Sequence, residues 1–195
     1  MRTVIGVMGS GESGDKALLA QARDLGAAIA TEGWVLLNGG RNSGVMDASA
    51  VGARNKGGFV IGILPDEGTA AASRHLDVAI RTGMGDGRNW INVLSSDVVI
   101  ALRGGAGTLS EVALALKAGR TVITLDFELG VAFDRYSRTH KLHRAASVEE
   151  AIAMAKKALR LRATAPLHSP VGSPTHDRAA RHAGSITPPA EERSS

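Results

Sequence analysis

The stretch of residues 97–119 reads DVVIALRGGAGTLSEVALALKAG. It begins with a continuous apolar run at 98–102, which is typical of a strand buried on both faces of a parallel sheet. Glycines follow at 104, 105 and 107, and a helical pattern of apolar residues begins at Thr108. A buried strand, a glycine loop and a helix in this order form the repeating unit of doubly wound α/β sheets.

The same alternation of strand and helix recurs on both sides of this stretch. Further apolar runs lie at 3–8, 34–38, 59–64, 77–82 and 121–126. Further helical patterns lie at 15–33, 43–58, 87–96 and 147–162. We therefore predict a Rossmann-like α/β fold in three layers, with a doubly wound, mostly parallel sheet and helices on both of its faces.

The composition changes near the end of the chain. The segment from Arg135 to Arg144 is basic and is expected to be a connector to a last helix capped by Ser147. From Ala163 onward the chain is rich in Pro, Ser, Thr and Ala and has few large apolar residues. We predict one folded domain over residues 1–162 and a disordered tail over 163–195.

The composition of the 195 residues restricts the class of function. There is no cysteine, which excludes disulfides and thiolate ligands, and the histidines show no pattern typical of a metal site. A net charge of +4 favours a small anionic ligand, while 3% aromatic content argues against a nucleic-acid partner. Neither a secretory leader nor a membrane-spanning run is recognisable, so we expect a cytoplasmic protein with no membrane partner.

Ligands of such sheets bind at the carboxyl ends of the strands, where several loops here are rich in glycine. The first loop, MGSGESG at 8–14, has the GxGxxG spacing of a dinucleotide site. A dinucleotide site also needs a carboxylate after the second strand, and Asn38 stands there instead. Two alternatives remain for this loop: a tight turn in which Asp15 caps the helix, or one wall of a different nucleotide site.

The second glycine loop also allows two interpretations. Gly104, Gly105 and Gly107 precede a helix whose free N–H groups can hold a phosphate, with Glu111 one turn further on. Alternatively, Thr108 and Glu111 form a T-x-x-E capping box, in which the glutamate bonds back to the start of the helix.

The pattern GGxGTxxE at 104–111 is similar to the signature of the LOG proteins, which are cytokinin-activating nucleoside 5′-monophosphate phosphoribohydrolases often mislabelled as lysine decarboxylases. The stretch GGRNSGVMDASAVGARNKGGFVIGILP at 39–65 resembles the family's second block, and GRNW at 87–90 supplies its arginine. The resemblance covers roughly residues 3–160. Residues 5–11, 62–65, 87–89 and 104–111 look closer to a bacterial subgroup that includes the molybdenum cofactor carrier.

The resemblance implies roles for individual residues. Arg88 and Glu111 would be the catalytic pair, although Arg88 could instead be a surface arginine paired with Asp86. The phosphate would lie on the backbone N–H groups of residues 105–108. The predicted nucleotide- and phosphate-binding residues are Gly9, Ser10, Gly39, Gly40, Gly44, Met46, Gly104, Gly105, Gly107 and Thr108.

Two functions follow from the resemblance. The first is hydrolysis of the N-glycosidic bond of a nucleoside 5′-monophosphate, which gives the free base and ribose 5-phosphate and requires no cofactor. The second is a non-catalytic carrier that binds molybdenum cofactor, a pterin phosphate. Arg103 and Asn89 replace a proline and a lysine of the hydrolase pattern, and this leaves the choice open. The family also implies a homodimer or a larger assembly.

Overall fold

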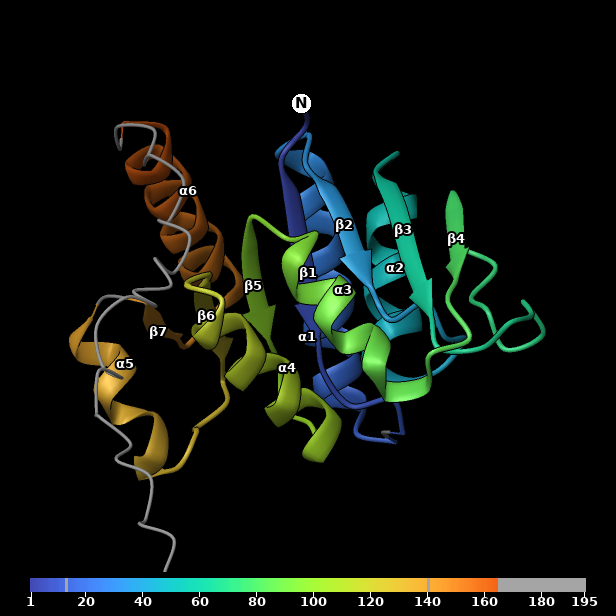
Figure 1. Ribbon diagram of the computed structural model, residues 1–195. Coiled ribbons are helices and arrows are strands. Elements are labelled where there is room, and N and C mark those ends of the chain that lie inside the picture. Colours follow the sequence, from blue (N-terminus) through green and yellow to red (C-terminus); the bar gives the residue numbers. More distant parts are fainter. Residues whose placement is uncertain (13, 140, 165–195) are drawn as a thin grey trace, which may run out of the picture. The chain divides into compact units, whose positions relative to one another are not determined.

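A seven-stranded parallel sheet with the strand order β4-β3-β2-β1-β5-β6-β7 forms the centre of the unit that spans residues 1–164 (Figure 1). The computed structural model describes residues 1–12, 14–139 and 141–164. The strands are β1 (Val4–Met8), β2 (Val35–Asn38), β3 (Phe59–Leu64), β4 (Val78–Arg81), β5 (Val98–Ala101), β6 (Thr121–Leu125) and β7 (Leu142–Ala145). Strand order reverses between β1 and β5, so the doubly wound α/β prediction is confirmed.

Helices cover both faces of the sheet. The α-helices are α1 (Lys16–Thr31), α2 (Gly44–Asn55), α3 (Asn89–Leu94), α4 (Ala106–Lys117), α5 (Asp134–Arg138) and α6 (Val148–Thr164). Two 3₁₀ turns are η1 (Gly85–Arg88) and η2 (Val131–Phe133). None of the helices in the described part of the chain is long and apolar enough to cross a membrane.

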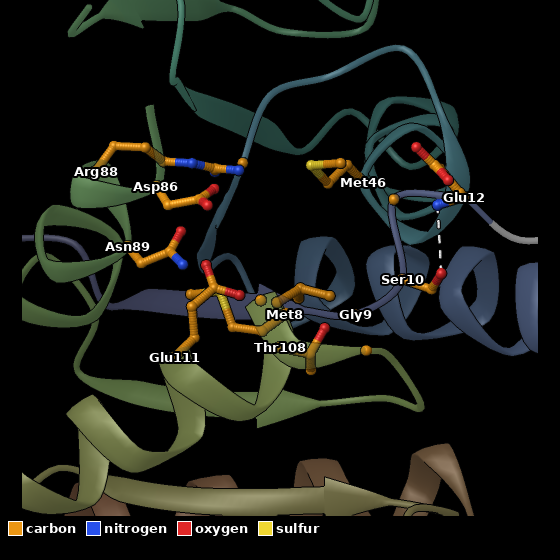
Figure 2. A pocket seen from close by; sticks show the side chains of 15 residues that line it. Met8, Gly9, Ser10, Glu12, Met46, Asp86, Arg88, Asn89, Thr108 and Glu111 are labelled. Carbon is orange, nitrogen blue, oxygen red and sulfur yellow. Dashed lines mark hydrogen bonds between the residues drawn. The ribbon is translucent and has the colours of Figure 1, made fainter. Parts of the chain in front are cut away.

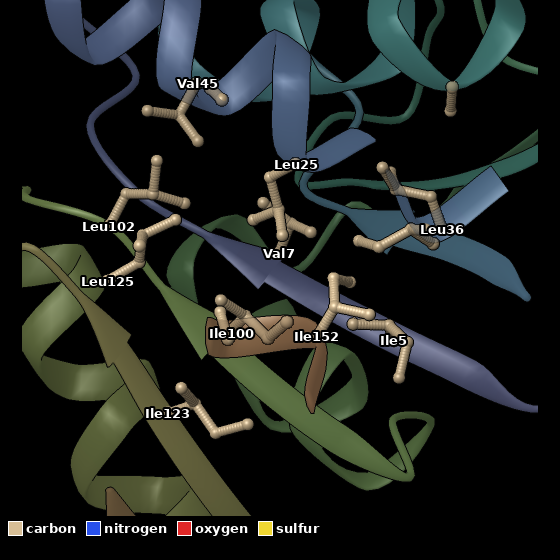
Figure 3. Packing of buried hydrophobic residues seen from close by; sticks show 14 of the residues in the cluster. Ile5, Val7, Leu25, Leu36, Val45, Ile100, Leu102, Ile123, Leu125 and Ile152 are labelled. Atoms are coloured by element: carbon tan, nitrogen blue, oxygen red, sulfur yellow. The ribbon is translucent and has the colours of Figure 1, made fainter. Parts of the chain in front are cut away.

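Alternate residues of the strands enter two separate cores. Ile5 and Val7 of β1 pack with α1, α2 and α6 on one face, as Figure 3 shows for part of this cluster. Met8 packs on the opposite face, against apolar residues of α3 and α4. This alternation follows from the two-residue period of a strand. Packing on both faces holds β1 and β5 in place, and the two glycine loops begin where these strands end.

Two predicted helix caps are confirmed. Asp15 Oδ1 accepts the N–H groups of Ala17 and Leu18, at 2.9 and 3.2 Å, at the start of α1. Ser147 Oγ accepts the N–H of Glu150 at 3.2 Å at the start of α6. Both caps satisfy helix N–H groups that have no partner within the helix.

The expectation for residues 135–144 was wrong, because this segment is more than a connector. It contains most of α5 and most of the edge strand β7. Only Leu142 and Ala145 of β7 are buried, while His143 and Arg144 are more exposed, so the strand has no continuous apolar run. Helix α6 extends to Thr164, two residues past the predicted domain end. The remaining tail prediction, 165–195, lies outside the described residues.

Candidate functional site

A cleft of about 380 Å³ opens at the carboxyl ends of β1 and β5, where the strand order reverses. This volume is within the range of small-molecule sites. Figure 2 shows Arg88 and Asp86 extending from η1 into the cleft beside the Glu111 carboxyl of α4, with Met46 and the Ser10 loop opposite. The cleft is lined by Val7, Met8, Gly9, Ser10, Gly11, Glu12, Gly39, Met46, Asp86, Arg88, Asn89, Gly105, Gly107, Thr108 and Glu111.

The N-terminus of α4 forms one wall of the cleft. The helix begins at Ala106, with Gly105 as its N-cap residue, and no side chain caps it. The expected start at Thr108 was therefore two residues late. Gly105, Gly107 and Thr108 all line the cleft, and the first N–H groups of a helix have no partner within the helix. Such a helix end attracts an anion through these N–H groups and through the helix dipole.

Glu111 is not part of a capping box. Because α4 begins at Ala106, Thr108 lies within the first turn and not at the cap position. The Glu111 carboxylate accepts a hydrogen bond from Asn92 Nδ2 at 2.8 Å and is only 7% exposed. Burial raises the pKa of Glu111 to about 7, against the opposing effects of the Asn92 hydrogen bond and the charge of Arg88. Glu111 can therefore exchange a proton near neutral pH.

Arg88 is half-buried at the end of η1, and its guanidinium reaches into the cleft. Its Nη1 donates to the Ile63 carbonyl at 3.1 Å, and its buried Nε has no hydrogen-bond partner among the described residues. Burial lowers the pKa of Arg88, while the Glu111 carboxylate opposes this change. Within the described chain no ion pair joins Arg88 to Asp86, so the interpretation of a paired surface arginine was wrong.

Three predicted binding glycines lie beside the cleft and do not line it. Gly44 has a φ of +57°, and a side chain there would overlap the Ser10 carbonyl. A side chain at Gly104 would overlap Thr108 and approach the Ser10 N–H. Gly40, with a φ of +76°, lies against Gly62. These glycines allow the loops to pack closely, so their contribution is to shape the cleft.

Asn38 has a structural role that explains the missing carboxylate of a dinucleotide site. Its side chain is fully buried, and its Nδ2 donates to the Met46 carbonyl at 2.8 Å and to Ser49 Oγ at 3.1 Å. Its Oδ1 accepts the Gly40 N–H at 2.8 Å. A carboxylate could not make the two donor contacts. Residues 9–12 of the first glycine loop line the cleft and form one of its walls.

The sequence interpretation missed two asparagines that join α3 to α4. Asn92 Nδ2 contacts Glu111, and Asn89 Nδ2 donates to Ser110 Oγ at 3.0 Å. Both asparagine side chains are buried. The available signal was a pair of polar residues three apart in a short apolar helix, which places them on one face. Asp86 and Glu12 also line the cleft and were not predicted.

With this geometry established, comparison with known proteins identifies the family. Residues 2–152 match the SLOG cluster4 family. The chain belongs to this family. The resemblance to LOG proteins inferred from the glycine loops is thereby confirmed, and the match includes both glycine loops, η1 and α4.

Two solved structures are similar to this chain over nearly their full length. The molybdenum cofactor binding protein of the phototrophic bacterium Rippkaea orientalis is 47% identical, with a TM-score of 0.77, covering 82% of this chain and 98% of that one. The molybdenum cofactor carrier protein of Chlamydomonas reinhardtii is 42% identical, with a TM-score of 0.75, covering 83% of this chain and 99% of that one.

A hydrolase is also similar, over a shorter region. The cytokinin riboside 5′-monophosphate phosphoribohydrolase of Mycobacterium tuberculosis is 40% identical over 96 residues, which are 48% of this chain. The match spans about half the length of that relative, 51%.

Proposed function

We propose that the cleft binds molybdenum cofactor, or a closely similar pterin monophosphate, and that the protein is a carrier of this ligand. The observation that carries the proposal is that α4 begins inside the cleft with no side chain at its cap, which suits a phosphate. The molybdenum cofactor proteins of Rippkaea and Chlamydomonas support the choice of ligand, because this chain matches 98% and 99% of their length.

The residues of the cleft suit such a ligand at its phosphate end. The backbone N–H groups of residues 105–108 would hold the phosphate, and the Arg88 guanidinium would supply a positive charge. Met46 and Met8 offer polarizable apolar surface for the flat ring system.

The test is to purify the protein from molybdenum-replete cells and to measure metal and pterin together. We expect molybdenum by elemental mass spectrometry and an oxidised pterin by fluorescence, in equal amounts. Arg88→Ala should lose most of both. Lys117→Ala is the matched control, because it removes one positive charge from the exposed side of α4, outside the cleft. Native protein that carries neither molybdenum nor pterin would overturn the carrier proposal.

A second candidate, hydrolysis of a nucleoside 5′-monophosphate, is favoured by Glu111. Its buried carboxyl lies in the cleft, and its pKa of about 7 suits a group that takes a proton from an attacking water. Water would form the new bond to the ribose carbon as the bond to the base breaks, and the departing base would receive a proton. The carboxylate would also stabilise positive charge that develops on the ribose, as in glycoside hydrolysis.

Release of ribose 5-phosphate distinguishes the two candidates. We would incubate the protein with a panel of nucleoside monophosphates and measure this product. Release that is abolished in Glu111→Gln would establish the hydrolase. If no member of the panel is cleaved, the hydrolase candidate fails and the carrier proposal is unaffected.

We also propose that the protein is a homodimer whose contact face includes α3. Trp90 and Leu94 lie one turn apart on α3 and are 40% and 44% exposed. Met84, just before η1, and Leu109, on α4, are also exposed. Burying such side chains stabilises an association. Light scattering should give twice the chain mass for the unaltered protein and the single chain mass for Leu94→Glu. A monomeric unaltered protein would contradict the proposal.

A further inference from the structure

The side-chain amide of Asn92 lies between α3 and α4, with one of its two ends hydrogen-bonded and the other without a partner among the described residues. The residue is fully buried, and its Nδ2 donates to Glu111 Oε1 at 2.8 Å. Its Oδ1 is buried and has no hydrogen-bond partner among the described residues. Leaving a buried acceptor unpaired costs on the order of 1–3 kcal/mol. An amide that served packing alone would therefore be a poor choice at this position.

The two ends of the amide match the two states of a carboxyl group. An ionised carboxylate only accepts hydrogen bonds, whereas a neutral carboxyl also donates one, and an asparagine carries both a donor and an acceptor. The backbone of Asn92 is held in place, since its carbonyl accepts the Ser96 hydroxyl at 2.7 Å. Rotation of the amide by half a turn exchanges Nδ2 and Oδ1 without moving the helix.

We propose that Asn92 is a positioning residue that holds Glu111 in both of its protonation states, presenting Nδ2 to the carboxylate and Oδ1 to the neutral carboxyl. This rests on the proposed function only in placing Glu111 within a ligand site. The unpaired Oδ1 is then the acceptor that the neutral carboxyl requires. A methyl-bearing side chain of similar size could serve neither state.

The surroundings of Glu111 allow its carboxyl to be ionised or neutral near neutral pH. Arg88 and Asp86 face it from η1, and Glu12 of the loop after β1 lines the same cleft. Strands β5 and β6, which lie under α4, consist of uncharged residues. Helix α3 contributes the uncharged Asn92, which donates to Glu111. Burial raises the pKa of Glu111 to about 7. A phosphate that binds nearby disfavours the carboxylate, so binding is accompanied by uptake of a proton at Glu111.

A titration by NMR tests the role of Asn92 without any ligand. Side-chain carboxyl signals of ¹³C-labelled glutamate are followed against pH, and Glu111 is assigned by the signal that Glu111→Gln lacks. In the unaltered protein we expect a midpoint near 7, and we expect the ¹⁵N side-chain amide signals of Asn92 to change with the same midpoint. In Asn92→Leu both bonds are lost, and the charge-assisted bond to the carboxylate is the stronger of the two. The midpoint should therefore rise.

Ser110→Ala is the matched control, because it removes the other asparagine bond between α3 and α4 and leaves Asn92 in place. Its Glu111 midpoint should equal that of the unaltered protein. An unchanged midpoint in Asn92→Leu would overturn the proposal, as would Asn92 amide signals that do not respond when Glu111 titrates. The second measurement uses the unaltered protein, so it decides the matter even if Asn92→Leu does not fold.

The coupling to ligand is measured separately by calorimetry with 5′-AMP as the probe. The affinity of the unaltered protein should fall several-fold between pH 6 and pH 8, and this fall should be smaller in Asn92→Leu. Equal pH dependence in the two proteins would contradict the proton-linked role. If 5′-AMP does not bind at any pH, the cleft does not accept a nucleoside monophosphate, and the NMR titration still decides the role of Asn92.

Discussion

Replacing Glu111 with glutamine measures what it costs the protein to keep an ionisable carboxyl in the cleft. The side chain is 7% exposed, and its pKa is raised from the ordinary 4.5 to about 7. The folded protein therefore holds this proton more tightly than the unfolded chain does. The free energy of unfolding contributed by the group is greatest at low pH and falls as the pH rises from 4.5 to 7, after which it is constant.

The size of the effect follows from the two pKa values. The interval from 4.5 to about 7 corresponds to about 3 kcal/mol. Glutamine is uncharged at every pH, has nearly the same size, and its oxygen can accept the bond from Asn92 Nδ2. Glu111→Gln should therefore match the unaltered protein near pH 4.5 and exceed its free energy of unfolding by about 3 kcal/mol at pH 8.

Urea unfolding followed by circular dichroism at a series of pH values measures this difference. Glu128→Gln serves as the control, because Glu128 is exposed and lies outside the cleft, and it should show no growing difference with pH. If Glu111→Gln is no more stable than the unaltered protein at pH 8, then ionisation of Glu111 does not lower the free energy of unfolding. The assignment of a raised pKa would then fail.

Three further substitutions, the first with a matched control, test the construction of the cleft. Gly104→Ala should lower the free energy of unfolding by about 1–3 kcal/mol in the urea assay, because the added methyl would meet the Ser10 nitrogen at 2.9 Å. Gly107→Ala is its control: there is open space around Gly107, so this substitution should leave the free energy of unfolding no lower. Asn38→Asp should cost about 1–3 kcal/mol and give no NAD binding by fluorescence titration, since a carboxylate cannot donate to Met46. Arg88→Lys should weaken 5′-AMP binding roughly tenfold by calorimetry without lowering the melting temperature.

The sheet could be predicted from the sequence because its central strands are continuous apolar runs. Val98–Ala101 is buried at every position, and this pattern has few alternatives. Strand β7 was missed for the opposite reason. It lies at the sheet edge and buries only Leu142 and Ala145, so its sequence resembles a charged loop. Edge strands make fewer contacts, and hydrophobic patterns carry correspondingly less information about them.

The glycine positions of the site could be predicted from the sequence. The side-chain contacts between α3 and α4 could not. Gly105 and Gly107 line the cleft, and Gly104 beside them has no room for a side chain. The pattern Thr108-x-x-Glu111 equally fitted a capping box, and only the start of α4 at Ala106 decides between the two. The partnership of Asn92 with Glu111 depends on how α3 packs on α4, which no local pattern specifies.

A titration of ¹⁵N-labelled protein with 5′-AMP tests most directly whether the start of α4 is the phosphate site. We expect the backbone amide signals of residues 105–108 to shift together and saturate with one dissociation constant, and inorganic phosphate at higher concentration to shift the same signals. Signals at 105–108 that remain unchanged while amides elsewhere respond would contradict this expectation.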